Sequence, residues 1–516
     1  MIKKHSYLNA NFLKNAHRIK HSFPTNCIQI KLGQGLRLPI IQMNGRYIDV
    51  AFLGIDLGTG GVRCLLLDEH GFIIKEVSHS LMQINLSNTP GESEQNALDW
   101  TGSLEAAFDE LFAVPKHRRI SAVAVDSTSG TVLPVNRFGR PLGPALLHND
   151  MRSKEEADAC KNIFGGDCSP TFSLPKILWM QKHLTLGDDA LFLHATDFLN
   201  AWLVGSVDIP TDFTNAMKTG VDLETGEWAE NLPSVNLPKV VSPGQVVGEV
   251  SNIHRKRWGL SGPCRLVSGA TDSNAAFYAS GAGLVGEWST TIGTTLAVKG
   301  LSGQRVNDLQ GRVYCHRHPD GLWLPGGASN AGGEILKLHF GDQIGALETK
   351  GMVSTVRPAI VYPSIRRGER LPISDPSFIP FGLNKSEGEL ELFLGCLEGL
   401  SFVEKMTFDL LEELGCEVGP LVFATGGGAS SSLGLQIRAN VLQRSLVVPE
   451  HPHSAMGSAI LAAAGFTSRK VGEVSKEMVK AAITINPVKF SDDSIKERFN
   501  LFRELCKQEK IKVNEP

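Results

Sequence analysis

The chain has 516 residues, and its 51 Lys and Arg against 54 Asp and Glu give a formal net charge of −3. This length predicts two or three domains, and the near-neutral balance argues against nucleic acid or an anionic membrane as a partner. A hydrophobic content of 42% with 20% charged residues is ordinary for a globular chain and excludes a disordered, collagen-like or coiled-coil protein.

The nine cysteines are scattered and never form a Cys-x-x-Cys pair. Such spacing argues for reduced thiols and against a zinc ribbon or a disulfide framework. His17 and His21 show the only His-x-x-x-His spacing, but no carboxylate stands near them, so we expect no zinc site. No segment has the long apolar run that a membrane-spanning helix needs.

The N-terminal 48 residues differ in charge from the rest of the chain. They carry eight Lys and Arg and no acidic residue, whereas the remaining 468 residues hold 43 basic and 54 acidic groups, a net charge of −11. A basic, acid-free leader before a clean strand pattern predicts an organelle transit peptide. The alternatives are a disordered basic tail or a wrongly assigned start of the gene, and Ser6 and Ser22 are few serines for a chloroplast leader.

The first predicted elements follow directly after the leader. Three apolar runs between 47 and 77, separated by two glycine turns, predict an antiparallel meander. Apolar residues at helical spacing predict a helix over 96–113, and 120–126 reads as a buried strand. Strands and helices alternate to about residue 280, which favours a sheet covered by helices.

A second set of elements begins at 288–298. There Ile292-Gly293-Thr294 repeats the pattern of Leu57-Gly58-Thr59, 235 residues further along the chain. Each copy follows an apolar run and precedes another strand, so we expect a duplicated α/β fold with a boundary near 284 and a cleft between two lobes. The predicted elements that follow are a helix over 388–414, a strand over 420–424, and helices over 431–444 and 453–465.

Glycine-rich turns supply the first candidate binding residues. Asp56-Leu-Gly-Thr-Gly-Gly61 joins two predicted strands, and its glycines let backbone N–H groups approach an anion while Thr59 adds a hydroxyl. Asp56 is an acceptor suited to hydrated Mg²⁺. A plain hairpin turn is the alternative, and the segment is neither a Walker A loop nor a Rossmann fingerprint.

Two further glycine segments have similar surroundings. Thr425-Gly-Gly-Gly-Ala-Ser430 follows a predicted strand and opens a helix, where backbone N–H groups can hold phosphate. Gly326-Gly-Ala-Ser-Asn330 repeats this arrangement before a predicted helix over 333–340. Close packing of helix on strand is the alternative, but three such turns at strand ends favour a shared phosphate site.

Asp272 is the candidate catalytic residue. It stands in Ser268-Gly-Ala-Thr-Asp272, just before a predicted helix of small residues. Asp in this place is commonly a helix N-cap. The functional alternative makes it the base that accepts a proton from a substrate hydroxyl attacking phosphorus.

Taken in order, these motifs resemble those of the FGGY carbohydrate kinases over about residues 50–466. The resemblance implies an α/β protein of two ribonuclease-H-like (actin/Hsp70/sugar-kinase) lobes, 49–284 for sugar and phosphate and 285–516 for nucleotide, with ATP and sugar in the cleft between them. The segments that carry it are Gly54-Ile-Asp-Leu-Gly-Thr59, Gly91-Glu-Ser-Glu-Gln95 with Trp100, Asn149-Asp-Met-Arg152, Gly269-Ala-Thr-Asp272, Ile292-Gly-Thr294, Gly368-Glu-Arg-Leu-Pro372 and Gly426-Gly-Gly-Ala429.

The resemblance also implies roles for particular residues. It makes Asp272 the catalytic base and Asp56 a catalytic aspartate linked to Mg²⁺. Glu94, Gln95 and Trp100 are interpreted as part of the lobe structure. The residues expected at the sugar and the transferred phosphate are Asp56, Gly60, Gly61, Val62, Arg63, Ser127, Thr128, Ser129 and Asp272. Those expected at the nucleotide are Thr59, Gly293, Thr294, Gly327, Gly426, Gly427, Gly428, Ala429 and Ser430.

The expected sugar loop is Asp126-Ser-Thr-Ser-Gly130. It lacks the Met-His pair typical of the family's xylulose kinases and the Arg-Glu pair of its glycerol kinases, and it is most similar to the D-ribulose kinases of plants and cyanobacteria. We therefore expect an ATP- and Mg²⁺-dependent D-ribulose kinase, with D-xylulose kinase or a non-catalytic nucleotide switch as alternatives. The resemblance also favours a plastid over a mitochondrion or the cytoplasm, with a homodimer as one possible assembly and neither nucleic acid nor membrane as a partner.

Overall fold

The structure is a computed structural model that describes residues 28–31, 37–40, 50–113, 119–166, 168–384, 388–488 and 493–511. The chain divides into two units, Met1–Asp49 and Val50–Pro516. In the first unit the described residues form strands β1 (Ile28–Lys31) and β2 (Arg37–Ile40), which pair antiparallel. The rest of the basic leader, with His17 and His21, lies outside the described residues, so the transit peptide stays a prediction.

The second unit contains a six-stranded sheet with the order β13-β14-β7-β3-β4-β5. Strands β3, β4 and β5 form the expected antiparallel meander, whereas β3, β7 and β14 run parallel. The three parallel strands are buried on both faces, as their unbroken apolar sequences require. The strands are β3 (Ala51–Leu57), β4 (Gly61–Asp68), β5 (Ile73–Ser80), β7 (Ile120–Ser127), β13 (Val246–Glu249) and β14 (Arg265–Thr271).

Helices of the first half of the chain cover one face of this sheet. In α2 (Ala97–Leu111) the residues Trp100, Leu104 and Phe108 are buried at helical spacing, and the Asn96 side chain caps the N-terminus by accepting from the Leu98 N–H. The predicted helix over 96–113 is therefore confirmed. The other helices of this half are α3 (Lys154–Ala159), α4 (Ser173–His183), α5 (Ala195–Val204), α6 (Phe213–Ala216), the 3₁₀ turn η2 (Met217–Thr219), α7 (Asn252–Arg257) and α8 (Asp272–Tyr278).

Short strands complete this half. They form one four-stranded sheet with the order β10-β8-β9-β6 and one parallel pair, β11 with β12. Their bounds are β6 (Glu94–Gln95), β8 (Val132–Val135), β9 (Ala145–Leu146), β10 (Leu191–His194), β11 (Thr211–Asp212) and β12 (Val240–Val241).

The second half of the chain builds a seven-stranded sheet with the order β17-β18-β16-β15-β19-β20-β21. Strand β15 pairs antiparallel with β16 and parallel with β19, which confirms the second start expected at 288–298. The strands are β15 (Trp288–Ile292), β16 (Leu296–Gly300), β17 (Tyr314–Arg317), β18 (Trp323–Ser329), β19 (Leu421–Thr425), β20 (Ser445–Pro449) and β21 (Ala481–Ile485).

Helices of the second half fall close to their predicted positions. The helices are α9 (Glu334–Phe340), η3 (Gly341–Gln343), α10 (Ile344–Gly351), α11 (Glu389–Glu413), η4 (Gly427–Ser430), α12 (Ser432–Leu442), α13 (Ser454–Thr467), α14 (Val471–Met478) and α15 (Asp493–Ile511). Within the described residues no helix is both long and apolar enough to span a bilayer.

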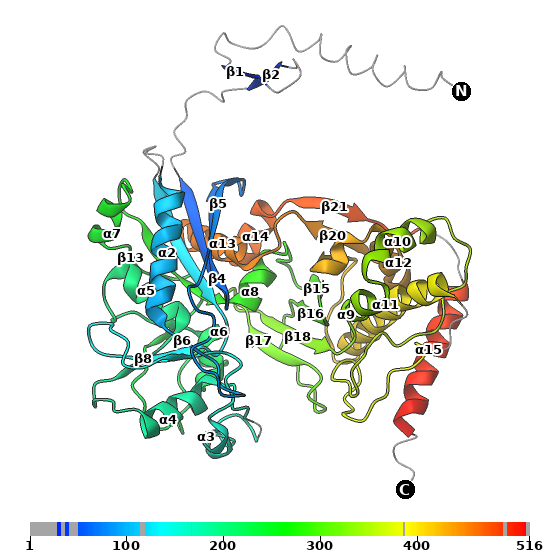
Figure 1. Ribbon diagram of the computed structural model, residues 1–516, viewed down its shortest axis with the longest axis horizontal. Coiled ribbons are helices and arrows are strands. Elements are labelled where there is room, and N and C mark those ends of the chain that lie inside the picture. The colour runs from blue at the N-terminus through cyan, green and yellow to red at the C-terminus, as the bar shows by residue number, and fades with distance from the viewer. Residues whose placement is uncertain are drawn as a thin grey trace. The chain divides into compact units, whose positions relative to one another are not determined.

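Helix α13 belongs to the second half in sequence but packs on the sheet of the first (Figure 1). It covers the face of that sheet opposite α2 and α5, in a separate apolar cluster that includes Phe52, Leu65 and Val267. Its small residues allow close contact with the sheet: a Cβ on Gly54 would lie 1.9 Å from the Ala455 carbonyl oxygen. The small-residue sequence of α13 is therefore explained by packing.

One predicted turn is a strand. Gly326 to Ser329 lie within β18, where Gly327 pairs with Val298, and the chain turns only after this segment. A Cβ on Gly327 would lie 2.8 Å from the Arg312 carbonyl oxygen and 2.9 Å from a methyl group of Leu371. The glycine pair is thus required by close packing on the sheet, and the prediction of a third glycine-rich turn was wrong.

Candidate active site

Three carboxylates converge at the carboxyl ends of three adjacent parallel strands. Asp56 on β3 pairs in register with Asp126 on β7, and Asp272 directly follows β14, whose Thr271 pairs with Ser127. Asp56 and Asp272 are half-buried, whereas Asp126 is fully buried. The carboxyl edge of a parallel sheet is the usual place for ligands in open α/β folds.

Helix α13 reaches this carboxylate group from behind. The Ser458 hydroxyl donates a hydrogen bond of 2.6 Å to Oδ2 of Asp126. Burial raises the pKa of Asp126 well above its usual range, and the charge of Asp56 raises it further. Asp126 therefore lies behind the site as a buried carboxyl group, and Asp56 and Asp272 are the two carboxylates that a ligand can reach.

Asp272 has the properties of a proton acceptor. Burial raises its pKa, and the nearby charge of Asp56 acts in the same direction. The Ser273 N–H, which donates to Oδ1 over 2.6 Å, opposes this shift, as do Lys299 and Lys218. A carboxylate of raised basicity at the edge of a ligand site suits a general base.

Two lysines that the sequence analysis did not single out lie beside Asp272. Lys299 on β16 is buried, its Nζ donates to Asn274 Oδ1 over 3.0 Å, and burial lowers its pKa to about 8. Lys218 in η2 donates from Nζ to the Ser129 carbonyl oxygen over 3.3 Å, and burial lowers its pKa as well. Lys299 could have been found from the sequence, because it stands in the apolar strand Leu296–Gly300 and a charged residue is rarely buried without a role.

The predicted sugar loop divides its side chains between two environments. Ser127 is buried, and its Oγ lies 2.7 Å from Thr196 Oγ1 on the core side. Thr128 and Ser129 are half-exposed, and the Thr128 hydroxyl pairs with that of Thr131 over 2.7 Å. The accessible hydroxyls of the loop are therefore those of Thr128 and Ser129.

The first glycine-rich turn presents its backbone to solvent. Gly60 is exposed and a Cβ there would meet no atom within 4 Å, whereas a Cβ on Gly61 would lie 2.5 Å from the His79 carbonyl oxygen. Val62 is buried in the core, and Arg63 is half-exposed with an ion pair to Glu76 at 3.4 Å. The backbone at Gly60 is thus the open part of the turn.

Gln95 and Trp100 support this turn from the core side. Gln95 donates from Nε2 to the Thr59 carbonyl oxygen, and Trp100 donates from Nε1 to Gln95 Oε1, each over 2.8 Å. Glu94 forms an ion pair with Arg152 at 2.8 Å. These contacts agree with the interpretation of the three residues as lobe structure.

A cavity of about 670 Å³ lies at the ends of β15 and β19. Its size falls in the range of small-molecule sites, about 300–1,000 Å³. Gly426 has a left-handed φ of 77°, where a side chain would be strained, and a Cβ there would lie 2.7 Å from the Ile292 carbonyl oxygen. The predicted nucleotide residues that line the cavity are Gly293, Thr294, Gly427, Gly428 and Ser430.

The remaining predicted nucleotide residues lie at different distances from this cavity. Gly426 and Ala429 adjoin it in the same turn, in which the Ala429 N–H donates to the Gly426 carbonyl oxygen over 3.0 Å. Thr59 belongs to the turn after β3, and Gly327 lies inside the second sheet and lines no part of the cavity.

The wall of the cavity contains a buried ion pair. Arg438 donates from Nε and Nη2 to the two carboxylate oxygens of Glu404 over 2.8 and 2.9 Å, and from Nη2 to Thr290 Oγ1 over 2.7 Å. Such two-point pairing fixes the plane of the guanidinium group. The side chain of Arg438 therefore forms a rigid part of the cavity wall.

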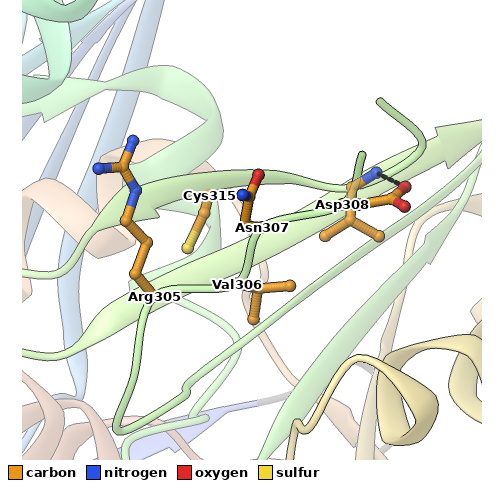
Figure 2. A pocket seen from close by; sticks show the side chains of 6 residues that line it. Arg305, Val306, Asn307, Asp308 and Cys315 are labelled. Atoms are coloured by element: carbon orange, nitrogen blue, oxygen red, sulfur yellow. Dashed lines mark hydrogen bonds between the residues drawn. The ribbon is translucent and has the colours of Figure 1, made fainter. Parts of the chain in front are cut away.

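A second cavity, of about 440 Å³, is lined by Arg305 to Asp308, Val313 and Cys315 (Figure 2). In it the Val313 N–H donates to Asp308 over 3.2 Å, and hydrogen bonds from Arg312 lower the pKa of Asp308 to about 2. None of the predicted site residues lines this cavity, so it is separate from the site described above.

The carboxylates fit a magnesium ion that is held mainly by water and phosphate. Among the described residues no group of three His, Cys, Asp or Glu side chains could hold a metal alone. Mg²⁺ in phosphoryl-transfer sites usually has one or two carboxylate contacts and keeps several waters. Asp56, half-exposed and next to the open turn at Gly60, meets that requirement.

The fold and this site define a class of protein. Two lobes built on mixed sheets, with carboxylates at the strand ends of one and a glycine-lined cavity in the other, form the two-domain α/β fold of sugar kinases related to actin and Hsp70. A crystal structure of a xyloylose kinase from Brucella ovis superposes with a TM-score of 0.77 at 23% identity, covering 88% of this chain and 98% of that one. At this identity the likeness concerns the fold alone.

Comparison of the sequence with family models identifies the family. The N-terminal domain of the FGGY family of carbohydrate kinases matches residues 51–278, and the C-terminal domain of the same family matches residues 288–466. The chain therefore belongs to the FGGY family, and it is a carbohydrate kinase.

Relatives within the family have different sugars in their names. A xylulose kinase from Staphylococcus epidermidis is 25% identical over 488 residues, which are 89% of this chain and 97% of the relative. A gluconokinase from Bacillus subtilis is 25% identical over 456 residues, 79% of this chain and 86% of the relative. The family resemblance of the sequence analysis is thus confirmed, whereas the choice of sugar is not decided by these names.

Proposed function

We propose that the chain is an ATP-dependent pentulose kinase that converts D-ribulose and ATP into D-ribulose 5-phosphate and ADP. The observation that carries this proposal is the placement of Asp272 near Asp56, within the electrostatic influence of Lys299 and Lys218 and next to the sugar loop. A base, a cationic environment for phosphate and a polar loop for the sugar are the parts that phosphoryl transfer to a hydroxyl requires.

In the proposed reaction Asp272 accepts the proton of the sugar hydroxyl as its oxygen attacks the γ-phosphorus. The new P–O bond forms as the bond between the γ-phosphorus and the bridging oxygen of ADP breaks, and the negative charge moves onto ADP. Lys299 and the open backbone of Gly60 stabilise charge on the transferred group. Closure of the lobes would keep water from taking the place of the sugar.

Asp56 is the residue that would hold Mg²⁺. When bound, the ion would neutralise charge on the β- and γ-phosphates of ATP. The nucleotide itself would occupy the cavity lined by Gly293, Gly427 and Gly428. A non-catalytic nucleotide switch is disfavoured, because Asp56 and Asp272 are both present.

The choice of D-ribulose rests on the sugar loop. Thr128 and Ser129 are its accessible hydroxyls, in place of the Met-His pair that the family resemblance associates with xylulose kinases. D-Xylulose, which differs from D-ribulose at C3, is the second candidate, and the names of several relatives favour it.

An ADP-release assay with D-ribulose, D-xylulose, L-ribulose, ribitol, glycerol and gluconate tests the proposal. We expect the highest kcat/KM with D-ribulose, at least about tenfold above D-xylulose, since one mispaired hydroxyl costs about 1–3 kcal/mol. A preference for D-xylulose would refute D-ribulose as the substrate but not the assignment as a pentulose kinase. Turnover with none of these substrates would refute the pentulose kinase.

The basic leader supports a second proposal, that residues 1–48 direct the protein to a plastid. Eight basic and no acidic residues are the composition of a targeting segment. A fluorescent protein fused behind these residues should accumulate in plastids. Fluorescence spread through the cytosol would refute the proposal of a targeting segment. Fluorescence in mitochondria would refute the plastid and assign the segment to mitochondria.

A further inference from the structure

A buried chain of hydrogen bonds lies beneath the site, on the side away from α13. It begins at the sugar loop, where Ser127 Oγ meets Thr196 Oγ1 over 2.7 Å. Asn215 donates from Nδ2 to the same Thr196 oxygen over 3.3 Å and to Asp212 Oδ2 over 2.7 Å. The chain thus leads from the sugar loop to the carboxylate of Asp212.

The other carboxylate oxygen of Asp212 continues the chain to the strand that carries the base. Oδ1 accepts from the Thr214 hydroxyl over 2.5 Å and from the Thr214 N–H over 2.8 Å. Because the Thr214 hydroxyl donates its proton to Asp212, its oxygen is free to accept, and it receives the Thr271 N–H over 2.9 Å. Thr271 is the residue directly before Asp272, so this bond holds the Ala270–Thr271 peptide at the end of the strand that leads to Asp272.

These side chains are all buried, and the most exposed of them, Thr214, has an exposed fraction of 4%. Packing alone does not account for four polar side chains and a carboxylate at one place, because a buried polar group costs free energy unless it is paired. Among the described side chains of this network only Asn215 Oδ1 lacks a partner, and a buried network paired in this way specifies one geometry of the backbone that it contacts.

The same short segment also carries Lys218. The segment 212–219 contains the Asp212 carboxylate, α6 and η2. At its end Thr219 Oγ1 forms a hydrogen bond with His194 Nε2 over 2.8 Å. One segment therefore contacts the sugar loop through Asn215, the base-bearing junction through Thr214, and the site itself through Lys218.

We propose that Asp212 and Thr214 are positioning residues, which hold the backbone before Asp272 and the sugar loop in a fixed mutual arrangement. The proposal rests on the proposed function only in taking Asp272 as the base. Neither residue touches a substrate; each acts through the group that it holds. Thr196 is the corresponding partner on the side of the sugar loop.

The test replaces Thr214 with Val, whose side chain has the same shape but neither accepts from Thr271 nor donates to Asp212, while the backbone N–H to Asp212 is kept. We expect kcat with D-ribulose to fall at least about tenfold, as the loss of one buried hydrogen bond allows, and the KM for ATP to change less than about twofold. Thr214→Ser restores the hydroxyl and should return kcat to within about threefold of wild type.

Thr407→Val is the matched control. Thr407 is a buried threonine of α11 whose hydroxyl donates to the Val403 carbonyl oxygen over 2.9 Å, remote from the network. Thr407→Val should lower the thermal midpoint about as much as Thr214→Val and leave kcat unchanged. If the control lowers kcat as much, or if Thr214→Ser is as impaired as Thr214→Val, the role is only structural and the proposal is overturned.

Hydrogen exchange gives a readout that needs no substrate. In Thr214→Val the amide of Thr271 should exchange at least about tenfold faster than in wild type, and in Thr214→Ser at the wild-type rate. Unchanged exchange in Thr214→Val overturns the proposal even if the wild-type protein phosphorylates none of the sugars, which separates this result from failure of the proposed function.

Thr196→Val provides a second variant should Thr214→Val not fold. It removes the partner of Ser127 and should raise the KM for the sugar at least about fivefold with the KM for ATP unchanged. A sugar KM within about twofold of wild type would overturn the part of the proposal that concerns the sugar loop.

Discussion

Replacing Asp272 with Asn tests the assignment of the base. Asn has the same shape, and its amide oxygen can still accept the Ser273 N–H, which now donates to Asp272 Oδ1 over 2.6 Å. Only the ability to take up a proton is lost. A general base contributes about 10²–10⁴-fold to the rate, or about 2.7–5.5 kcal/mol, so kcat should fall by at least about 10².

The same substitution should not destabilise the protein. Burial and the charge of Asp56 raise the pKa of Asp272 in the folded state above its unfolded value. Between those two pKa values the folded protein binds more protons than the unfolded one. The contribution of Asp272 to the free energy of unfolding therefore falls as pH rises. At pH 7 an uncharged amide should therefore leave the thermal midpoint equal or higher.

The assay measures ADP release with D-ribulose at saturating ATP, and calorimetry measures the affinity for ATP. Asp188→Asn, at an exposed position before β10, removes the same charge away from the site and should leave both quantities unchanged. If Asp272→Asn keeps more than about a tenth of wild-type kcat while binding ATP normally, the base is another group and the reasoning from the strand-end carboxylates is wrong.

Three other substitutions have defined outcomes. Ser129→Ala should narrow the D-ribulose to D-xylulose ratio of kcat/KM to less than about threefold, and an unchanged ratio would place the selectivity elsewhere. Gly54→Ala should lower the free energy of unfolding by at least about 2 kcal/mol in urea, because its Cβ would overlap the Ala455 carbonyl, whereas Gly60→Ala should cost less than about 1 kcal/mol. Burial lowers the pKa of His318 to about 4 in the folded state, so between pH 4 and about 6.5 the unfolded chain binds more protons than the folded one. The urea midpoint of unfolding should therefore rise with pH over this window, and it should rise less in His318→Gln.

Local sequence was sufficient to predict the elements that frame the site. Unbroken apolar runs identified β3 and β7, and helical spacing identified α2, because each signal lies within one element. The glycine pair at Gly326 and Gly327 shows the limit of this reasoning. Two adjacent glycines favour a turn locally, but here the contacts that exclude a side chain at Gly327 come from Arg312 and Leu371, which no local pattern contains.

The side chains of the sugar loop show a related limit. Because β7 extends through Ser127, Asp126 and Ser127 point to opposite faces of the sheet, one toward Ser458 on α13 and the other toward Thr196 on α5. The hydroxyl-rich sequence predicts a loop in which the Ser127 hydroxyl faces the sugar, but in the strand this hydroxyl faces the core. Contacts of Lys218 with Ser129, 89 residues apart, were equally beyond a local reading.

The position of α13 has a consequence for the order in which the chain can fold. The sheet of the first half has one apolar face, with Phe52, Leu65 and Val267, that is covered by a helix made of residues 454–467. During synthesis that face stays uncovered until almost the whole chain has left the ribosome, and exposed apolar sheet surface promotes aggregation of partly folded chains. A fragment that stops near residue 284 should consequently be insoluble, and adding a peptide that spans α13 should recover soluble protein.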